Sequence, residues 1–150
     1  MDLKTINFKI ENEIAFIELN RPKQYNSLNQ AMAEDLFQVS LECDDNPNIR
    51  SVLMSGVGDD AFCAGGDVNS FHKYGDKTAS HLKEVTASLH GAISRRSRMN
   101  VPLVVAVTGV AAGAGFSFLA HPPKLVSTSG IGFFNQTGSA LVFYSNLSSR

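Results

Sequence analysis

Two glycine-rich segments, each directly after a short apolar run, constrain the fold of this chain more than any other feature. The first reads Phe62-Cys63-Ala64-Gly65-Gly66-Asp67, and the second, Gly109-Val110-Ala111-Ala112-Gly113-Ala114-Gly115, begins 47 residues later. Each apolar run has the length of a strand, and each glycine segment precedes residues that can begin a helix. Such turns leave main-chain N–H groups without helical partners, so two turns facing each other could hold one developing negative charge.

Composition predicts one globular domain, because the chain has 150 residues, of which 43% are hydrophobic and 18% charged. A net charge of −1 gives no electrostatic basis for binding nucleic acid or a membrane surface. The two cysteines form neither a disulfide framework nor a zinc site, and the N-terminal residues resemble no targeting peptide. We therefore expect no metal and a reduced, cytoplasmic setting.

The acidic residues are distributed unevenly along the chain. All 14 lie at or before Glu84, where eight basic residues leave a net charge of −6. Residues 85–150 contain five basic residues and no carboxylate side chain. A stretch of 66 residues without Asp or Glu limits the acid–base chemistry that the second half can supply.

The first half is expected to contain a hairpin and a helix. Residues 7–10 and 14–20 are predicted strands, with Ile14 and Phe16 facing inward and Ile17 left open. A helix is predicted from near Ser27, because Ser27-x-x-Gln30 fits a capping box. Its apolar stripe has spacings of three and four residues and comprises Leu28, Met32, Leu36, Val39 and Cys43.

The second half is expected to alternate strands with helices. Residues 51–55 and 103–107 are predicted strands, and residues 77–99 between them a helix. The buried face of that helix is marked by Leu82, Val85, Leu89 and Ile93. A further helix is expected to begin at Ala114 and to break at His121-Pro122-Pro123. This order predicts an α/β fold.

Three segments together resemble the crotonase superfamily, the enoyl-CoA hydratase/isomerase proteins. They are Leu19-Asn20-Arg21-Pro22-Lys23 with Asn26 and Leu28, then residues 62–67, then residues 107–116, in the family's order and spacing. The resemblance implies a superhelix of strand-strand-helix units, with residues 1–117 as its N-terminal part. Residues 118–150 would be a diverged tail, although residues 125–126 and 134–136 look like the family's next strand and turn.

The resemblance also implies an acyl-CoA thioester as substrate, with coenzyme A as part of that substrate and no separate cofactor. The thioester oxygen would accept hydrogen bonds from the catalytic N–H groups of Gly66 and Ala114. Losing one such donor typically costs about 3–4 kcal/mol of transition-state stabilisation. The coenzyme A groove would be lined by Lys23, Gln24, Tyr25, Ala64, Gly66, Asp67 and Val68.

The chain departs from the family's pattern in its acids and in its length. Hydratases of the family carry a catalytic glutamate at the position of Ser117, and the next acid about 20 residues later is also missing. The family continues for about another 100 residues that complete the core and build trimers or hexamers. We therefore expect a truncated chain without the trimer-forming region, with weak thioester binding and little turnover. The alternative is a non-catalytic truncated product or an interaction module without a ligand.

Several single residues have a structural interpretation that we favour over a catalytic one. Asp67 is expected to cap the following turn rather than act as a base. Cys63 is expected to be a small buried apolar residue rather than a nucleophile. Surface positions are expected for His72, His81 and His90, and a solvated helix end for Arg95, Arg96 and Arg98, with a coenzyme A phosphate contact by these arginines left open. Gly113-Ala114-Gly115 lacks the full dinucleotide-binding motif.

Overall fold

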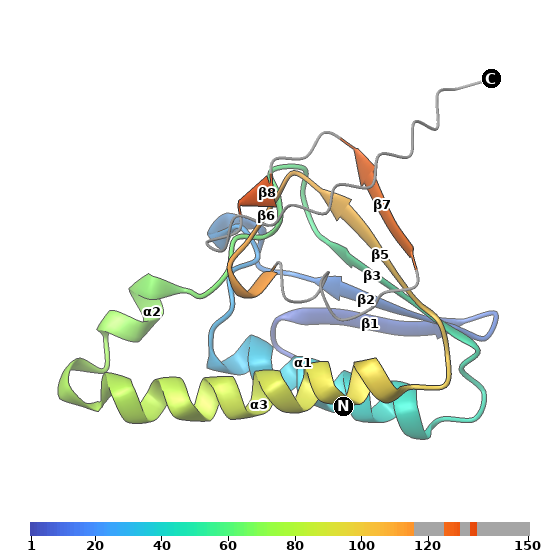
Figure 1. Ribbon diagram of the computed structural model, residues 1–150, viewed down its shortest axis with the longest axis horizontal. Helices are drawn as coiled ribbons and strands as arrows, with labels where there is room; N and C mark the ends of the chain where they lie inside the picture. The colour runs from blue at the N-terminus through green and yellow to red at the C-terminus, as the bar shows by residue number, and fades with distance from the viewer. Residues whose placement is uncertain (116–124, 130–132, 135–150) are drawn as a thin grey trace.

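The computed structural model describes residues 1–115, 125–129 and 133–134 (Figure 1). Three layers surround a shared interior in Figure 1: a large sheet, a small sheet and a pair of long helices. Within the described residues, none of the helices is long and apolar enough to cross a lipid bilayer.

The large sheet has the strand order β1-β2-β3-β5-β7. β1 and β2 form the expected antiparallel hairpin, and β3, β5 and β7 add to it in parallel. The strands are β1 (Ile6–Glu11), β2 (Ile14–Leu19), β3 (Ser51–Gly56), β5 (Leu103–Thr108) and β7 (Leu125–Ser129). The strand expected at residues 125–126 is therefore confirmed as β7.

A second, parallel sheet was missed by the sequence analysis. It has the order β4-β6-β8, from β4 (Ala61–Cys63), β6 (Val110–Ala112) and β8 (Phe133–Phe134). These strands have two or three residues each, too few to show an alternating hydrophobic pattern. β4 also overlaps the first glycine-rich segment and β6 overlaps the second, and the glycines in these segments predict turns rather than strands.

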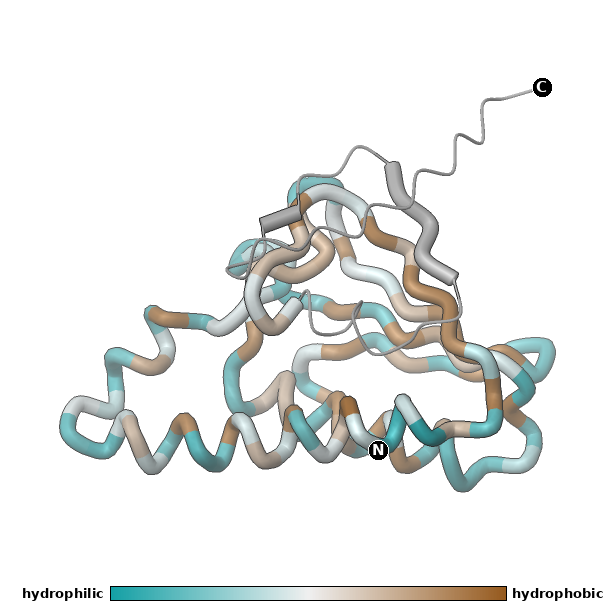
Figure 2. The backbone as a smooth tube through the Cα atoms, in the orientation of Figure 1, coloured by the Kyte–Doolittle hydropathy of each residue, from teal (hydrophilic) through white to brown (hydrophobic). Residues whose placement is uncertain are grey.

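The long helices α1 (Gln30–Asp45) and α3 (Thr78–Arg98) pack side by side beneath the sheets (Figure 1). Short helical segments complete the described chain: η1 (Pro22–Gln24), α2 (Val68–His72) and η2 (Gly75–Lys77). In Figure 2, hydrophobic residues gather on β3 and β5, while the β1–β2 turn is hydrophilic. This distribution fits a core enclosed by the sheets and the helix pair.

The inward face of β2 was predicted wrongly. Ala15, Ile17 and Leu19 are almost fully buried, whereas Ile14 and Phe16 are only half-buried. Successive strand residues point to opposite faces, so the face is decided by which set meets the helices. Both sets in β2 contain large apolar side chains, and the sequence pattern therefore could not separate them.

The start of α1 was also predicted wrongly, although its apolar stripe was confirmed. The N-cap is Asn29, whose side-chain oxygen accepts a hydrogen bond from the Met32 N–H at 3.0 Å. Met32, Leu36, Val39 and Cys43 are buried as expected. Ser27 lies in a buried loop before the helix, so the capping-box pattern placed the N-cap two residues too early.

The buried face of α3 includes two charged or titratable residues that were expected at the surface. Val85 and Leu89 are buried as predicted, but His81 and Arg96 are also buried, with exposed fractions of 5% and 7%. Arg96 donates a hydrogen bond to the Met54 sulfur at 3.0 Å. The predicted solvated helix end therefore holds for Arg95 and Arg98 and is wrong for Arg96, which faces the sheet.

Candidate functional site

The two glycine-rich segments lie side by side because β4 and β6 pair in parallel. Ala61 is opposite Val110 and Cys63 is opposite Ala111, with a register irregularity between the two pairs. Parallel strands end at the same edge of a sheet, so both glycine turns leave the small sheet at one edge. Gly66 lies three residues beyond Cys63, and Ala114 lies three residues beyond Ala111. The two turns that the sequence analysis singled out are therefore neighbours in the fold.

Glycine is needed where the two turns touch. A Cβ atom on Gly65 would lie 3.0 Å from the Ala112 carbonyl oxygen, and one on Gly113 would lie 3.6 Å from the Cα atom of Gly65. Both glycines have left-handed backbone, with φ of 97° and 52°. A Cβ atom on Gly115 would overlap the main chain of Cys63. The turns therefore contact each other through main chain.

Each turn presents one of the two N–H groups that the sequence analysis assigned to catalysis. Gly66 is exposed and Ala114 is half-buried, and Ala114 and Gly115 have helical conformation. Within the described part of the chain, no turn, loop or cap hydrogen bond is donated by the N–H of Gly66 or Ala114. Such donors can bind an oxygen on which negative charge develops.

Asp67 follows the first glycine turn, and its side chain is held by two groups. Its carboxylate accepts hydrogen bonds from the Arg21 guanidinium at 2.8 Å and from the Ser70 N–H at 3.0 Å. The Ser70 bond caps α2, which confirms the capping role expected from the sequence. Burial raises the pKa of Asp67, but the Arg21 and Ser70 hydrogen bonds and the Arg21 charge outweigh it, so the pKa lies below its ordinary value.

Asn26 anchors the loop that carries Arg21, a role that the sequence analysis did not assign. Its amide donates hydrogen bonds to the carbonyl oxygens of Val57 at 3.0 Å and Ala61 at 2.9 Å, and its oxygen accepts one from the Arg21 N–H at 2.9 Å. Asn26 is fully buried, and both Tyr25 and Asn26 have left-handed backbone. Asparagine tolerates that conformation better than most residues, which was the available signal in the sequence.

The residues predicted for the coenzyme A groove come from two neighbouring segments. Lys23 and Gln24 lie in η1, and the Ala64 N–H donates a hydrogen bond to the Tyr25 carbonyl oxygen at 3.0 Å, which joins η1 to the first glycine turn. Of the seven predicted residues, Asp67 is buried, and those exposed are Lys23, Gln24, Tyr25, Ala64, Gly66 and Val68. The structure thus brings the two predicted segments together on one surface.

The thiol beside the first turn does not supply a base. Cys63 is fully buried, and burial raises the pKa of its thiol to about 11. Its expected role as a small buried residue is therefore confirmed. Ser117 lies outside the described residues, as does the His121-Pro122-Pro123 segment. Within the described residues, no group of three His, Cys, Asp or Glu side chains could hold a metal ion.

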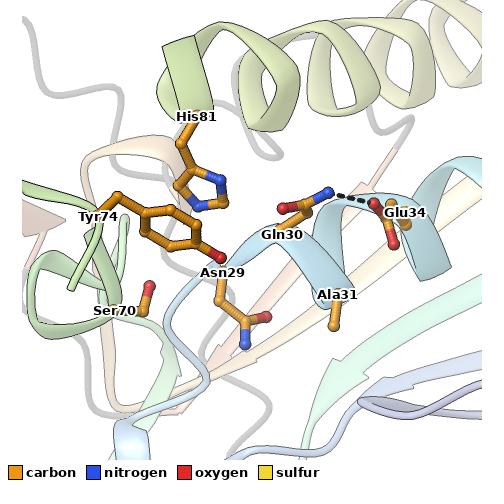
Figure 3. Close-up of a pocket in the computed structure, with 7 residues that line it drawn as sticks. All are labelled: Asn29, Gln30, Ala31, Glu34, Ser70, Tyr74 and His81. Atoms are coloured by element: carbon orange, nitrogen blue, oxygen red, sulfur yellow. Dashed lines mark hydrogen bonds between the residues drawn. The ribbon is translucent and has the colours of Figure 1, made fainter. Parts of the chain in front are cut away.

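A separate polar cavity of about 270 Å³ lies where α1 and α3 begin (Figure 3). His81 lines it and stacks on Tyr74, with ring centroids 3.6 Å apart and planes inclined by 12°. The remaining lining residues are Asn29, Gln30, Ala31, Glu34 and Ser70. None of the residues predicted to bind the thioester lines this cavity. The burial of His81 had a sequence signal, because His81, Val85 and Leu89 share a four-residue spacing.

A large mixed sheet, a small parallel sheet and paired helices, with two glycine turns at one edge, define a crotonase-type fold. Solved structures agree with this description. The protein PA4980 of Pseudomonas aeruginosa has a TM-score of 0.79 and 29% identity, over 89% of this chain and 56% of that chain. An enoyl-CoA hydratase of Bacillus anthracis has a TM-score of 0.76 and 23% identity, over 87% of this chain and 50% of that chain.

The chain belongs to the enoyl-CoA hydratase/isomerase family, whose family model matches residues 14–136. YngF of Bacillus subtilis, named as a member of this family, is 32% identical over 143 residues, covering 92% of this chain and 53% of YngF. The 1,2-epoxyphenylacetyl-CoA isomerase of Escherichia coli is 33% identical over 107 residues, covering 71% of this chain and 40% of the isomerase. The chain thus spans about half the length of such relatives, or less.

Proposed function

We propose that this protein binds acyl-CoA thioesters, with the thioester oxygen accepting hydrogen bonds from the N–H groups of Gly66 and Ala114. The carrying observation is the parallel register, which pairs Cys63 with Ala111 and puts both donors three residues beyond that pair. Relatives whose names give a reaction, such as the epoxyphenylacetyl-CoA isomerase, act on coenzyme A thioesters. Family membership and geometry therefore support the same ligand class.

In this proposal, coenzyme A lies along the surface formed by η1 and the first glycine turn. The lining residues would be the exposed groove residues Lys23, Gln24, Tyr25, Ala64 and Val68. Lys23 supplies a positive charge for the phosphates of coenzyme A, and Tyr25, 56% exposed, supplies an apolar surface. Residues 1–117 would supply the groups of this binding site, in the cytoplasm, and β7 and β8 would support it by pairing with β5 and β6.

We further propose that the chain has little or no hydratase or isomerase turnover. Hydrogen bonds to the thioester oxygen stabilise an enolate-like charge, but a separate group must move the proton. Asp67 is committed to Arg21 and to the cap of α2, and residues 85–150 contain no carboxylate side chain. The chain would therefore bind and polarise the thioester but lack the group that moves the proton to complete the reaction.

The binding proposal is tested by thermal unfolding of the full chain with crotonyl-CoA. A ligand specific for the folded state raises the free energy of unfolding by about 2.7 kcal/mol at 100 times its Kd. Ala114→Pro removes one N–H donor at the first helical position, where proline is tolerated, and should weaken binding by at least tenfold. Ala114→Ser keeps the N–H and is the matched control, expected to bind as the wild type does.

The two parts of the proposal have separate contradicting outcomes. Absence of any stabilisation by crotonyl-CoA, or equal binding by Ala114→Pro and Ala114→Ser, would contradict the binding site. Turnover of crotonyl-CoA at a rate of about 10 s⁻¹, the median for enzymes, would contradict the expected lack of catalysis.

A second candidate function is a structural role in an assembly, without a small-molecule ligand. The small ribosomal subunit protein mS47 of Neurospora crassa is 30% identical over 139 residues, covering 83% of this chain and 27% of mS47. Its name is that of an assembly component rather than an enzyme. Normal folding together with no response to crotonyl-CoA or free coenzyme A would favour this candidate.

A further inference from the structure

We propose that Arg21 is a positioning residue that fixes the direction of the Gly66 N–H group, by joining the loop before α1 to the first glycine turn. This inference rests on the proposed function, which gives the N–H its ligand. Arg21 lies 46 residues before Asp67 and bonds both to Asp67, which follows Gly66, and to Ser27, which precedes Leu28, the residue that pairs with Gly66. Its side chain is 14% exposed, so it belongs to the interior of the site rather than to its ligand surface.

The direction of the Gly66 N–H follows from the main-chain bonds on either side of it. The Leu28 N–H donates to the Gly65 carbonyl oxygen at 2.7 Å, and the Asp67 N–H donates to the Leu28 carbonyl oxygen at 2.8 Å. In a trans peptide the C=O and N–H point in opposite directions. Because the Gly65 carbonyl points to Leu28, the N–H in the same peptide points away from Leu28.

The Arg21 side chain joins the segment that contains Leu28 to the segment that contains Gly66. One guanidinium nitrogen donates to the Asp67 carboxylate at 2.8 Å, and the other donates to the Ser27 carbonyl oxygen. Ser27 precedes Leu28 and Asp67 follows Gly66, so the planar guanidinium spans both sides of the bridge. A lysine carries the same charge on a single nitrogen and cannot reproduce this two-nitrogen geometry.

The position of Arg21 is itself fixed by the buried Asn26. The Asn26 oxygen accepts from the Arg21 N–H, while its amide nitrogen donates to the main chain at Val57 and Ala61. The network therefore runs from the end of β3 and the start of β4, through Arg21, to the turn that carries Gly66. Donor direction matters because an oxyanion donor acts over about 2.7–3.1 Å.

The test measures polarisation of the ligand separately from its affinity. The probe is butyryl-CoA labelled with ¹³C at the thioester carbonyl, whose infrared stretching frequency falls when the oxygen accepts hydrogen bonds. We expect a lowered frequency in the wild type and a return toward the value in water for Arg21→Lys. The Kd should rise by less than about threefold, because coenzyme A supplies most of the contact area.

Arg95→Lys is the matched control, since Arg95 also pairs with a carboxylate, that of Asp44, at 2.9 Å on the exposed side of α3. It should leave both the frequency and the Kd unchanged. Asp67→Asn is the second variant at the site, used in place of Arg21→Lys should the latter not fold. This substitution removes the carboxylate charge that pairs with Arg21 and keeps the shape of the side chain.

A second readout needs no ligand. Hydrogen exchange of the Leu28 amide, measured by NMR, reports the bond to the Gly65 carbonyl that fixes the peptide. Arg21→Lys should accelerate this exchange by about tenfold, the effect of losing one charge-assisted hydrogen bond, and leave the amide of Val39 in α1 unchanged.

The outcomes separate this inference from the proposed function. The positioning role would be overturned by two results together. The wild type and Arg21→Lys would bind the probe with the same lowered frequency, and their Leu28 amides would exchange at the same rate. Failure of the wild type to bind would overturn the proposed function, and Leu28 exchange would then decide alone whether Arg21 fixes the turn. Loss of the frequency shift in Arg95→Lys would also count against the inference, because the effect would then not be local.

Discussion

The two glycine turns of this protein lie next to each other but are held in place by different means. The first turn is tied to the rest of the molecule by side chains, through Arg21, Asn26 and Asp67. The second is placed by the absence of side chains, with Gly109 against Asp60 and Gly115 against Cys63. Polar substitutions and pH should therefore act mainly on the first turn, whereas a methyl group added at Gly109 or Gly115 should act on the second.

The largest expected effect is that of a methyl group added to the second turn. In Gly109→Ala, the new Cβ would overlap the main chain of Asp60, and the residue would keep a φ of 68°. Overpacking costs up to about 3 kcal/mol and left-handed backbone about 1 kcal/mol, so the free energy of unfolding should fall by about 4 kcal/mol. Urea denaturation measures the change.

Gly75→Ala provides the control for this prediction. Gly75 also has left-handed backbone, with a φ of 52°, but apart from its chain neighbours no described residue has an atom within 4 Å of its added Cβ. Its cost should be about 1 kcal/mol, from the backbone alone. Equal losses for the two variants would show that crowding against Asp60 does not hold the second turn.

The next effect concerns the side-chain anchor of the first turn. Asn26→Ala leaves the carbonyl oxygens of Val57 and Ala61 without this donor in a buried site, and should cost about 2 kcal/mol. Asn20→Ala removes an exposed hydrogen bond to Asn7 and should cost less than about 0.5 kcal/mol. Thermal unfolding of both variants tests the difference, and a cost for Asn26→Ala no larger than that for Asn20→Ala would contradict the anchoring role.

A smaller effect on acidification should reach the first turn but not the second. The pKa of Asp67 is lowered in the folded state, so its contribution to stability is present above the ordinary value of 3.8 and is lost as the pH falls toward the folded value. The charges that face it are those of Arg21 and Lys73. The stability difference between wild type and Asp67→Asn should therefore shrink below about pH 4. A difference constant from pH 7 to pH 3 would contradict this assignment.

The last effect concerns thiol chemistry at the contact between the turns and leaves stability unchanged. Burial raises the pKa of Cys63 to about 11, so at pH 8 only about one thiol in a thousand is ionised. Iodoacetamide should modify Cys63 at least a hundredfold more slowly than a thiol in the unfolded chain. Rapid modification of native Cys63 would show that the contact with Gly115 opens readily.

Regular elements of this protein were predictable from sequence because their patterns extend over many residues. The spacing of three and four residues from Met32 to Cys43 repeats over three helical turns, so one misplaced cap at Ser27 did not affect the assignment of α1. The turn chemistry of residues 62–67 was equally visible, because consecutive glycines after an apolar run have few other uses.

Other features depend on contacts between distant segments and could not be predicted. Arg96 lies seven residues after Leu89 on the buried stripe of α3, but its hydrogen bond to Met54 depends on how α3 packs against β3. The pairing of Arg21 with Asp67 likewise joins residues 46 positions apart. The strands β4 and β6 are too short to show a recognisable hydrophobic period. Their strand conformation depends on their pairing with each other, which no pattern within either segment reveals.

The parallel pairing of Cys63 with Ala111 sets the distance between the two turns through the main chain, independently of side chains. Backbones in any sheet lie about 4.8 Å apart, and this constant sets how far apart the two turns begin. The helical segments α2 and α3, which lie between the two turns in the sequence, do not set that interval. Substitutions or changes of length in these helices can therefore accumulate while the spacing of the two turns stays the same.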